Sequence, residues 1–206
     1  MAHWCVGRAA SRAQPLHYLP PSPLPLPLLF LDHDDGSNNF RDTNNLLVWG
    51  GGKSYLGFAK TYMGNMYLFP EANEPELSAG NGNPYCYGSA GSSPLPARLR
   101  DVWVNETCFT ASAGGGDLYG IDCNPSAPDD GQAPLLANNS LFTPDGGYAL
   151  KCGGATWDLA QAQAHGLDVG STVAATPDTP TVLAAAAAFV RDVLLAGYAP
   201  LAELKN

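Results

Sequence analysis

The chain has 206 residues, of which 45% are apolar and 14% are charged, and its formal net charge at pH 7 is −9. The apolar fraction is enough for the core of one domain. The 10 Lys and Arg residues form no basic cluster, which argues against nucleic acid as a partner because phosphates need cationic side chains. The 23 Gly and 18 Pro residues predict many short elements joined by tight turns.

Residues 1–31 are a Pro-rich segment that we exclude from the predicted fold. Five prolines interrupt the apolar run from Pro20 to Leu31, so a membrane-spanning helix cannot propagate there. The segment is also a poor signal peptide, because it lacks a clean apolar run and a small-residue cleavage site. We predict a disordered N-terminal segment over 1–31 and no membrane span in the chain.

From residue 32 to 176, apolar bursts of about three to five residues predict β-strands. Bursts such as 46–49, 66–69 and 102–104 are bounded by Asn or Gly, and asparagines at 45, 65, 105 and 139 anchor them. The first spacing fits one coil of a β-solenoid, about 20 residues, and the others fit two coils or one coil with a long loop. Residues 71–98 predict such a side loop. A β-sandwich, in which Asn and Gly mark hairpin turns, is the alternative.

Two helices are predicted near the C-terminus. Thr156 is the expected N-cap of a helix over 157–165 that stops at Gly166, and His165 is interpreted as a helix cap. Thr179-Pro180-Thr181 opens an Ala-rich helix that is expected to reach about Leu195. We expect residues 177–206 to form a capping helix and tail, since an uncovered strand edge exposes unpaired backbone groups.

The cysteines and two glycosylation sequons predict an extracellular or cell-surface protein that passes through the secretory pathway. Cys86, Cys108, Cys123 and Cys152 allow three disulfide pairings, between which the sequence does not choose, and Cys5 stands apart. No Cys-x-x-Cys pair is present, so a structural zinc site is not expected. The sequons are Asn105-Glu106-Thr107 and Asn138-Asn139-Ser140.

Two stretches carry a pattern of turns and strands that is shared with a known superfamily. The first contains Asp34-Asp35-Gly36-Ser37, Asn44-Asn45-Leu46-Leu47-Val48, Gly51-Gly52-Lys53-Ser54-Tyr55-Leu56-Gly57 and Gly64-Asn65-Met66-Tyr67. The second runs from Asn138 to Ser171 and includes a Pro-Asp-Gly turn and Gly166-Leu167-Asp168-Val169-Gly170-Ser171. Both resemble segments of right-handed parallel β-helix proteins of the pectate-lyase-like superfamily. The resemblance implies an all-β solenoid over 32–176 with C-terminal helices, but no single activity, because the superfamily includes enzymes and surface proteins.

The resemblance also directs attention to one group of ionisable residues. β-helix lyases use a Lys or Arg to remove a proton from the sugar carbon beside a carboxylate, whose charge a cation neutralises. The candidate catalytic residues are therefore His33, Asp34, Asp35, Lys53 and Lys60. Asp32, Asp34 and Asp35 are candidate ligands for Ca²⁺, which prefers oxygen. A charged turn over 32–37 without a site is the alternative.

The sequence leaves three functions open and does not decide whether the protein is an enzyme. The favoured function is a secreted or cell-surface protein associated with carbohydrate, whose partner is a polysaccharide or glycan. The alternatives are a polysaccharide lyase or glycoside hydrolase, and a non-catalytic fragment of a larger protein. Five aromatic residues form either a sugar-stacking platform or, as we prefer, part of the core: Trp49, Tyr55, Tyr62, Tyr67 and Trp103.

Overall fold

Three parallel sheets make up the main body of the structure. The computed structural model describes residues 31–33, 38–55, 58–70, 85–90, 100–121, 123 and 134–202. The first sheet contains β1 (Leu31–His33), β4 (Gly52–Tyr55), β7 (Tyr87–Ala90) and β10 (Tyr119–Gly120). The second contains β2 (Arg41–Thr43), β5 (Thr61–Met63), β8 (Val102–Val104) and β11 (Leu135–Ala137). The third contains β3 (Leu46–Val48), β6 (Met66–Leu68), β9 (Thr107–Phe109), β12 (Ser140–Thr143) and β15 (Thr172–Ala175).

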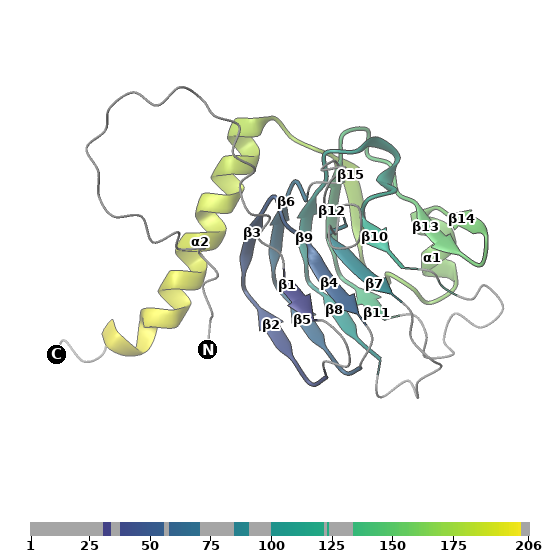
Figure 1. The fold of residues 1–206 in the computed structure, drawn as a ribbon. Coiled ribbons are helices and arrows are strands. Elements are labelled where there is room, and N and C mark those ends of the chain that lie inside the picture. Colours follow the sequence, from purple (N-terminus) through teal and green to yellow (C-terminus); the bar gives the residue numbers. More distant parts are fainter. Residues whose placement is uncertain are drawn as a thin grey trace, which may run out of the picture.

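The order in which the chain visits these sheets determines which strands become neighbours. From β1 to β12 the chain enters the first, second and third sheets in rotation, so adjacent strands of a sheet come from successive passes (Figure 1). The last pass departs from this rotation. Between β12 and β15 lie an antiparallel hairpin, β13 (Leu150–Cys152) and β14 (Ala155–Trp157), and helix α1 (Leu159–Ala164).

The expected fold class, an all-β right-handed parallel β-helix, is therefore corrected. The chain forms three parallel sheets, a two-stranded hairpin and helices, a mixed α and β arrangement without a closed solenoid. The physical reason lies in the C-terminal third, where the hairpin and α1 replace strands of the first two sheets, and where helix α2 (Thr179–Ala202) follows. The two helices are expected from the sequence, whereas the antiparallel hairpin is not.

A central column of aromatic side chains fills the space between the sheets. Tyr62 and Trp103 occupy the middle positions of β5 and β8, and both are fully buried. The ring centroids of Trp103 lie 5.9 Å from those of Tyr67 and Tyr87 and 5.4 Å from that of Tyr119. Offset and edge-to-face aromatic pairs of this kind stabilise a core beyond their buried area.

Helix α2 packs on the outer face of the third sheet. Val182 and Ala186 are buried there, in a cluster with Met66, Leu68 and Phe109. The other side of α2 is exposed, including Leu183 and Leu195. By length and composition, the segment Thr179–Ala196 could cross a membrane, although one such helix is weak evidence for a span. The sequence analysis predicted no membrane span and did not identify this segment. The helix also runs past the predicted end near Leu195, because a single Gly such as Gly197 costs only about 1 kcal/mol in a helix.

Helix α1 begins later than the sequence analysis predicted. Its N-cap is Asp158, whose side chain accepts a hydrogen bond from the N–H of Gln161, while the Gln161 side chain accepts one from the N–H of Asp158. Thr156 instead lies in β14. The prediction that His165 closes this helix is confirmed, and its ring stacks on Trp157 with centroids 4.4 Å apart.

Two disulfides join parts of the chain that belong to different elements. Cys86 pairs with Cys108, and Cys123 pairs with Cys152, closing sequence separations of 22 and 29 residues. The first links the start of β7 to the middle of β9, and the second attaches the β13–β14 hairpin to the chain that follows β10. Loops of this length constrain the unfolded chain by about 3 kcal/mol each in the chain-entropy model.

Candidate functional site

The connections between the second and third sheets share a three-residue pattern, which we call the corner tripeptide. The five corner tripeptides are residues 44–46, 64–66, 105–107, 138–140 and 170–172. In each, the first residue has a positive φ, between 55° and 77°; the second turns inward; the third begins a strand of the third sheet. Asn and Gly at the first position suit this left-handed conformation.

The second residues of the corner tripeptides form a continuous polar column inside the molecule. The backbone N–H of each donates to a side-chain oxygen of the next: Asn45 to Asn65 Oδ1 (2.9 Å), Asn65 to Glu106 Oε2 (2.8 Å), Glu106 to Asn139 Oδ1 (3.0 Å) and Asn139 to Ser171 Oγ (2.8 Å). The expected Asn anchors at 45, 65 and 139 lie in this column. The anchor expected at 105 is wrong, because Asn105 is the exposed first residue of its tripeptide and Glu106 takes the inward position.

Glu106 is the most unusual member of the polar column because it places a carboxyl group where the other rows have an amide or a hydroxyl. It is 1% exposed and also accepts from Nδ2 of Asn65 at 3.1 Å. Within the described part of the chain, no cationic side chain forms an ion pair with it. Burial raises the pKa of Glu106 well above the ordinary value of 4.5, against the opposing effect of the hydrogen bonds from Asn65.

The raised pKa of Glu106 predicts a specific pH dependence of stability. The folded state binds this proton more tightly than the unfolded state does. Protonation of Glu106 therefore adds its full contribution to the free energy of unfolding below pH 4.5, and this contribution is lost as the pH rises through the folded-state pKa. The Glu106→Gln variant lacks this titration. We expect the free energy of unfolding of the natural protein, relative to that of Glu106→Gln, to decrease from acidic to neutral or higher pH. Urea denaturation of both proteins at a series of pH values measures it, and a constant difference would contradict it.

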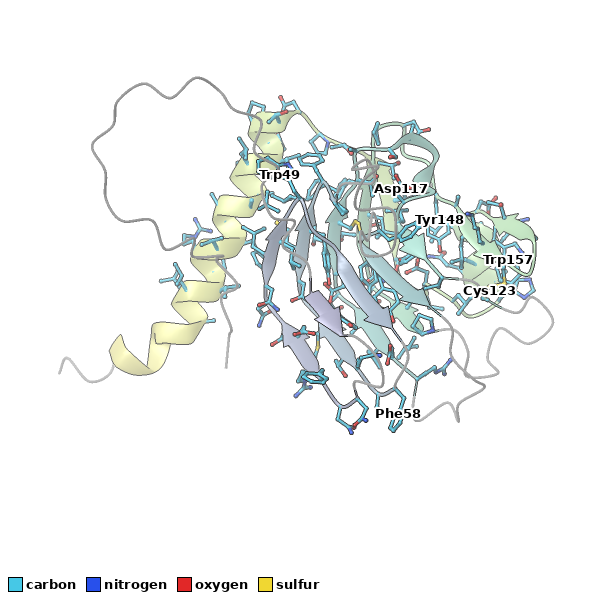
Figure 2. All side chains as sticks on the ribbon, in the orientation of Figure 1. Trp49, Phe58, Asp117, Cys123, Tyr148 and Trp157 are labelled. Atoms are coloured by element: carbon cyan, nitrogen blue, oxygen red, sulfur yellow. A yellow bond between two sulfur atoms is a disulfide. The ribbon has the colours of Figure 1, made fainter. Side chains whose placement is uncertain are left out.

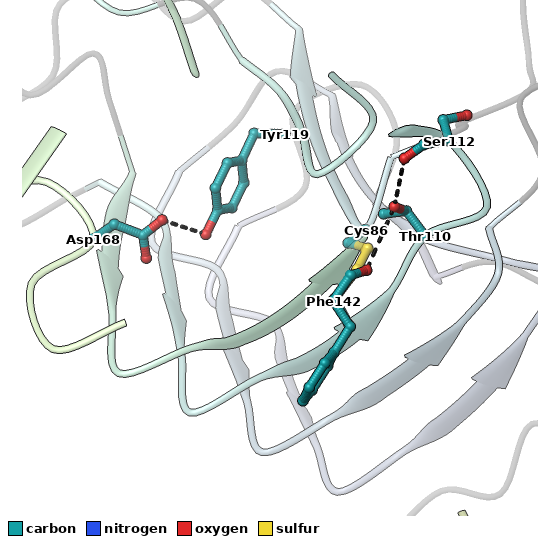
Figure 3. The surroundings of a disulfide bond; sticks show 7 residues. Cys86, Thr110, Ser112, Tyr119, Phe142 and Asp168 are labelled. Carbon is teal, nitrogen blue, oxygen red and sulfur yellow. Dashed lines mark hydrogen bonds between the residues drawn. A yellow bond between two sulfur atoms is a disulfide. The ribbon is translucent and has the colours of Figure 1, made fainter. Parts of the chain in front are cut away.

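A second buried carboxylate, Asp168, ends the polar column. It accepts hydrogen bonds from the hydroxyls of Tyr119 (2.5 Å) and Tyr148 (3.0 Å), from Asn139 Nδ2 (3.1 Å) and from the hydroxyl of Ser171. Figure 3 shows Tyr119 pointing toward Asp168 across the interior. Asp168 is fully buried, and burial of the two tyrosines, followed by the charge of Asp168, raises the pKa of both hydroxyls. The arrangement gives each carboxylate oxygen two donors.

Lys60, a predicted catalytic residue, lies at another place in the fold. It directly precedes β5 and is 1% exposed. Its Nζ is 3.6 Å from Oδ2 of Asp101, and its backbone N–H donates to Oδ1 of the same residue at 2.9 Å. The hydroxyl of Tyr87 donates to Oδ2 of Asp101 at 3.2 Å. Burial lowers the pKa of Lys60, which the charge of Asp101 partly offsets. This group joins two successive passes of the chain and is enclosed.

The other predicted site residues lie on or next to the first sheet. The register pairs Asp32 with Lys53 and His33 with Ser54 across β1 and β4. Since successive positions of a strand alternate between the faces of a sheet, the positions of Asp32 and Lys53 share one face and that of His33 belongs to the other. The predicted catalytic and metal-binding residues Asp34 and Asp35 lie outside the described residues. Among the residues that are described, no group of His, Cys, Asp or Glu could hold a metal ion.

The predicted aromatic platform divides between the inside and the outside of the molecule. Tyr62, Tyr67 and Trp103 are buried in the core, as preferred in the sequence analysis. Trp49, which follows β3 and has a φ of 61°, is 46% exposed. It lies toward the opposite end of the stacked sheets from Trp157 (Figure 2). The side chain of Tyr55 lies outside the described part of the structure, and among the other four residues Trp49 alone is exposed.

The sequence analysis did not single out Asp101, Glu106 or Asp168. Most of their partners are distant in sequence. Asn65 is 41 residues from Glu106, and Tyr119, Asn139 and Tyr148 are 49, 29 and 20 residues from Asp168, although Ser171 is only 3 residues away. Lys60 is 41 residues from Asp101. The available signal was the recurrence of a left-handed Asn or Gly followed by a polar residue and a strand. Aligning the tripeptides on that pattern would have placed Glu106 in the column.

Comparison with known proteins does not extend these observations. No family model, curated protein or solved structure matches the chain. The resemblance to pectate-lyase-like proteins therefore stays a prediction. The two disulfides are compatible with a secreted protein and indicate an oxidising environment.

Proposed function

We propose that this protein is secreted or displayed at the cell surface, where it is a non-catalytic scaffold that associates with carbohydrate. Trp49 carries the carbohydrate part of the proposal. Trp49 is 46% exposed directly after β3, whereas Tyr67 in the paired strand β6 is fully buried. An exposed indole offers an apolar face on which a sugar ring can stack. The two disulfides support the proposed location.

The buried ionisable groups support a scaffold in preference to an enzyme. Lys60 is enclosed with Asp101, and Glu106 and Asp168 are held by the polar column. Catalytic groups must reach the proton that they transfer, within hydrogen-bond distance or through one water. These three groups instead link successive passes of the chain, which is a stabilising role.

A polysaccharide lyase is the second candidate, because the register of β1 and β4 pairs Asp32 with Lys53. A lysine and an aspartate at paired strand positions suit the predicted lyase chemistry, in which Lys53 is the base and the aspartates are cation ligands. The two candidates make different predictions for the same protein. A scaffold binds a polysaccharide without changing it, whereas a lyase releases unsaturated products and loses that activity in Lys53→Ala.

The test combines secretion, binding and product analysis. The protein is produced behind a leader in a eukaryotic secretory host, and its free thiols are counted before and after reduction. Binding to a panel of acidic and neutral polysaccharides is then compared for the natural protein, Trp49→Ala and Val169→Ala, an exposed apolar control. We expect binding about tenfold weaker in Trp49→Ala alone. Equal binding by all three proteins would refute the role of Trp49, and unsaturated products, with or without Ca²⁺, would favour the lyase.

A further inference from the structure

The two glycosylation sequons occupy the same place in the fold. Asn105-Glu106-Thr107 and Asn138-Asn139-Ser140 are both corner tripeptides, and β8 and β11, which precede them, pair in parallel with Val104 opposite Ala137. Strands of a sheet are about 4.8 Å apart, so the two acceptor asparagines are neighbours on the corner. Their backbone N–H groups donate to Ala137 O (3.1 Å) and Val169 O (3.0 Å), which fixes both in the corner.

Each tripeptide separates an exposed acceptor from a buried neighbour. Asn105 and Asn138 are exposed, whereas Glu106 and Asn139 are 1% exposed and belong to the polar column. The left-handed φ of 55° at both acceptors directs the second residue inward and leaves the first on the outer side of the corner. Within the described residues, no hydrogen bond is formed by either acceptor side chain, so a group attached at Nδ2 would break none, although Oδ1 of Asn138 lies against Gly170.

The remaining corner tripeptides provide an internal comparison. Asn44 has the same left-handed conformation and is also exposed, but Leu46 stands where a sequon needs Ser or Thr. The first residues of two other tripeptides are Gly64 and Gly170, which have no side chain to modify. Asn124-Pro125-Ser126 has the outer residues of a sequon, but a proline in the middle prevents its use.

We propose that Asn105 and Asn138 carry N-linked glycans, which lie side by side and cover the outer side of this corner. The donor is a lipid-diphosphate-linked oligosaccharide. Transfer forms a bond between Nδ2 and C1 of the first sugar and breaks the bond between that C1 and a diphosphate oxygen. The lipid diphosphate leaves with the electron pair, and the amide gives up one proton. The inference rests on the secretory location in the proposed function, and a glycan at these exposed positions adds a bulky, solubilising group to the surface.

The test uses the whole chain behind a heterologous leader in a eukaryotic secretory host, with intact mass measured before and after peptide N-glycosidase F. We expect the natural protein to lose the mass of two glycans. Thr107→Val and Ser140→Ala keep both asparagines, but the glycosidase should remove the mass of only one glycan from each. From the double variant, which also keeps both asparagines, it should remove no glycan mass. Asn44→Gln should behave as the natural protein, and Leu46→Thr should gain a third glycan on the same corner.

The outcomes separate this inference from the proposed function. A secreted protein with oxidised thiols and no glycosidase-sensitive mass would overturn the glycans and leave the proposed location standing. Retention in the cell with free thiols would count against the proposed location, while the mass of the retained protein still reports on the glycans, because the leader delivers the chain to the transferase. Modification at a residue other than Asn105 or Asn138 would also overturn the inference.

Discussion

Replacing Asp168 with alanine should lower the free energy of unfolding by about 4 kcal/mol, because the change removes the acceptor of several buried donors at once. The hydroxyls of Tyr119 and Tyr148 and the amide of Asn139 would each lose a hydrogen bond, and of these residues only Tyr148 is partly exposed. Alanine also tolerates the left-handed φ of 54° less well than aspartate does. For a chain of this size, the melting temperature should fall by roughly 10 °C. Urea and thermal denaturation measure both quantities.

Two conservative variants serve as controls for the Asp168 prediction. Tyr148→Phe removes one donor and should cost about 1 kcal/mol. Asp168→Asn keeps the shape and the left-handed conformation but places an amide N–H₂ toward one pair of donors, so its cost should be intermediate. If Asp168→Ala is no less stable than Tyr148→Phe, Asp168 does not organise this end of the polar column.

The second large effect is expected for Trp103→Ala, which should cost about 4 kcal/mol through the cavity left in the aromatic column. Trp103 is fully buried, and its ring lies within 6 Å of three tyrosine rings. Trp103→Phe should cost much less, because a ring still fills most of the volume. Equilibrium denaturation gives the three values.

Trp49→Ala is the matched control for Trp103→Ala, since it removes the same side chain from an exposed position. We expect a change within about 0.5 kcal/mol. Equal costs at the two tryptophans would mean that the aromatic column does not dominate the stability of the core.

Local patterns predicted several strands but not the way in which they assemble. The bursts at 46–49, 66–69 and 102–104 correspond to β3, β6 and β8. Strand β7, which lies inside the predicted loop over 71–98, has no such burst in its sequence Tyr-Gly-Ser-Ala. Its neighbours β4 and β10 specify it through parallel pairing and through the buried ring of Tyr87, and no local pattern records those contacts.

The prediction of the fold class failed for a related reason. After the Pro-Asp-Gly turn that follows β12, the chain leaves the parallel sheets and forms the antiparallel β13–β14 hairpin, which the predicted solenoid does not contain. Disulfide Cys123–Cys152 holds that hairpin in place. Four cysteines allowed three pairings, so the sequence could not reveal this attachment in advance.

The candidate site was only partly accessible from the sequence. The sequence correctly marked Asn45, Asn65 and Asn139 as anchors, because Asn is favoured in side-chain ladders. It gave no role to Asp101, whose partner Lys60 is 41 residues away. Ionisable residues near one another in sequence attracted attention, whereas the buried pairs are formed by residues from different passes of the chain.

The corner tripeptides also bear on how this chain can change in length. Consecutive members of the polar column are separated by 20, 41, 33 and 32 residues, yet they make the same N–H to side-chain hydrogen bond. Strand alignment is therefore reset at each corner, whatever the length of chain between corners. Evolution or protein engineering can lengthen the intervening loops without shifting the sheets, because long surface insertions cost little loop-closure entropy. A single residue inserted within a tripeptide would move the inward side chain out of the column and turn the following strand over.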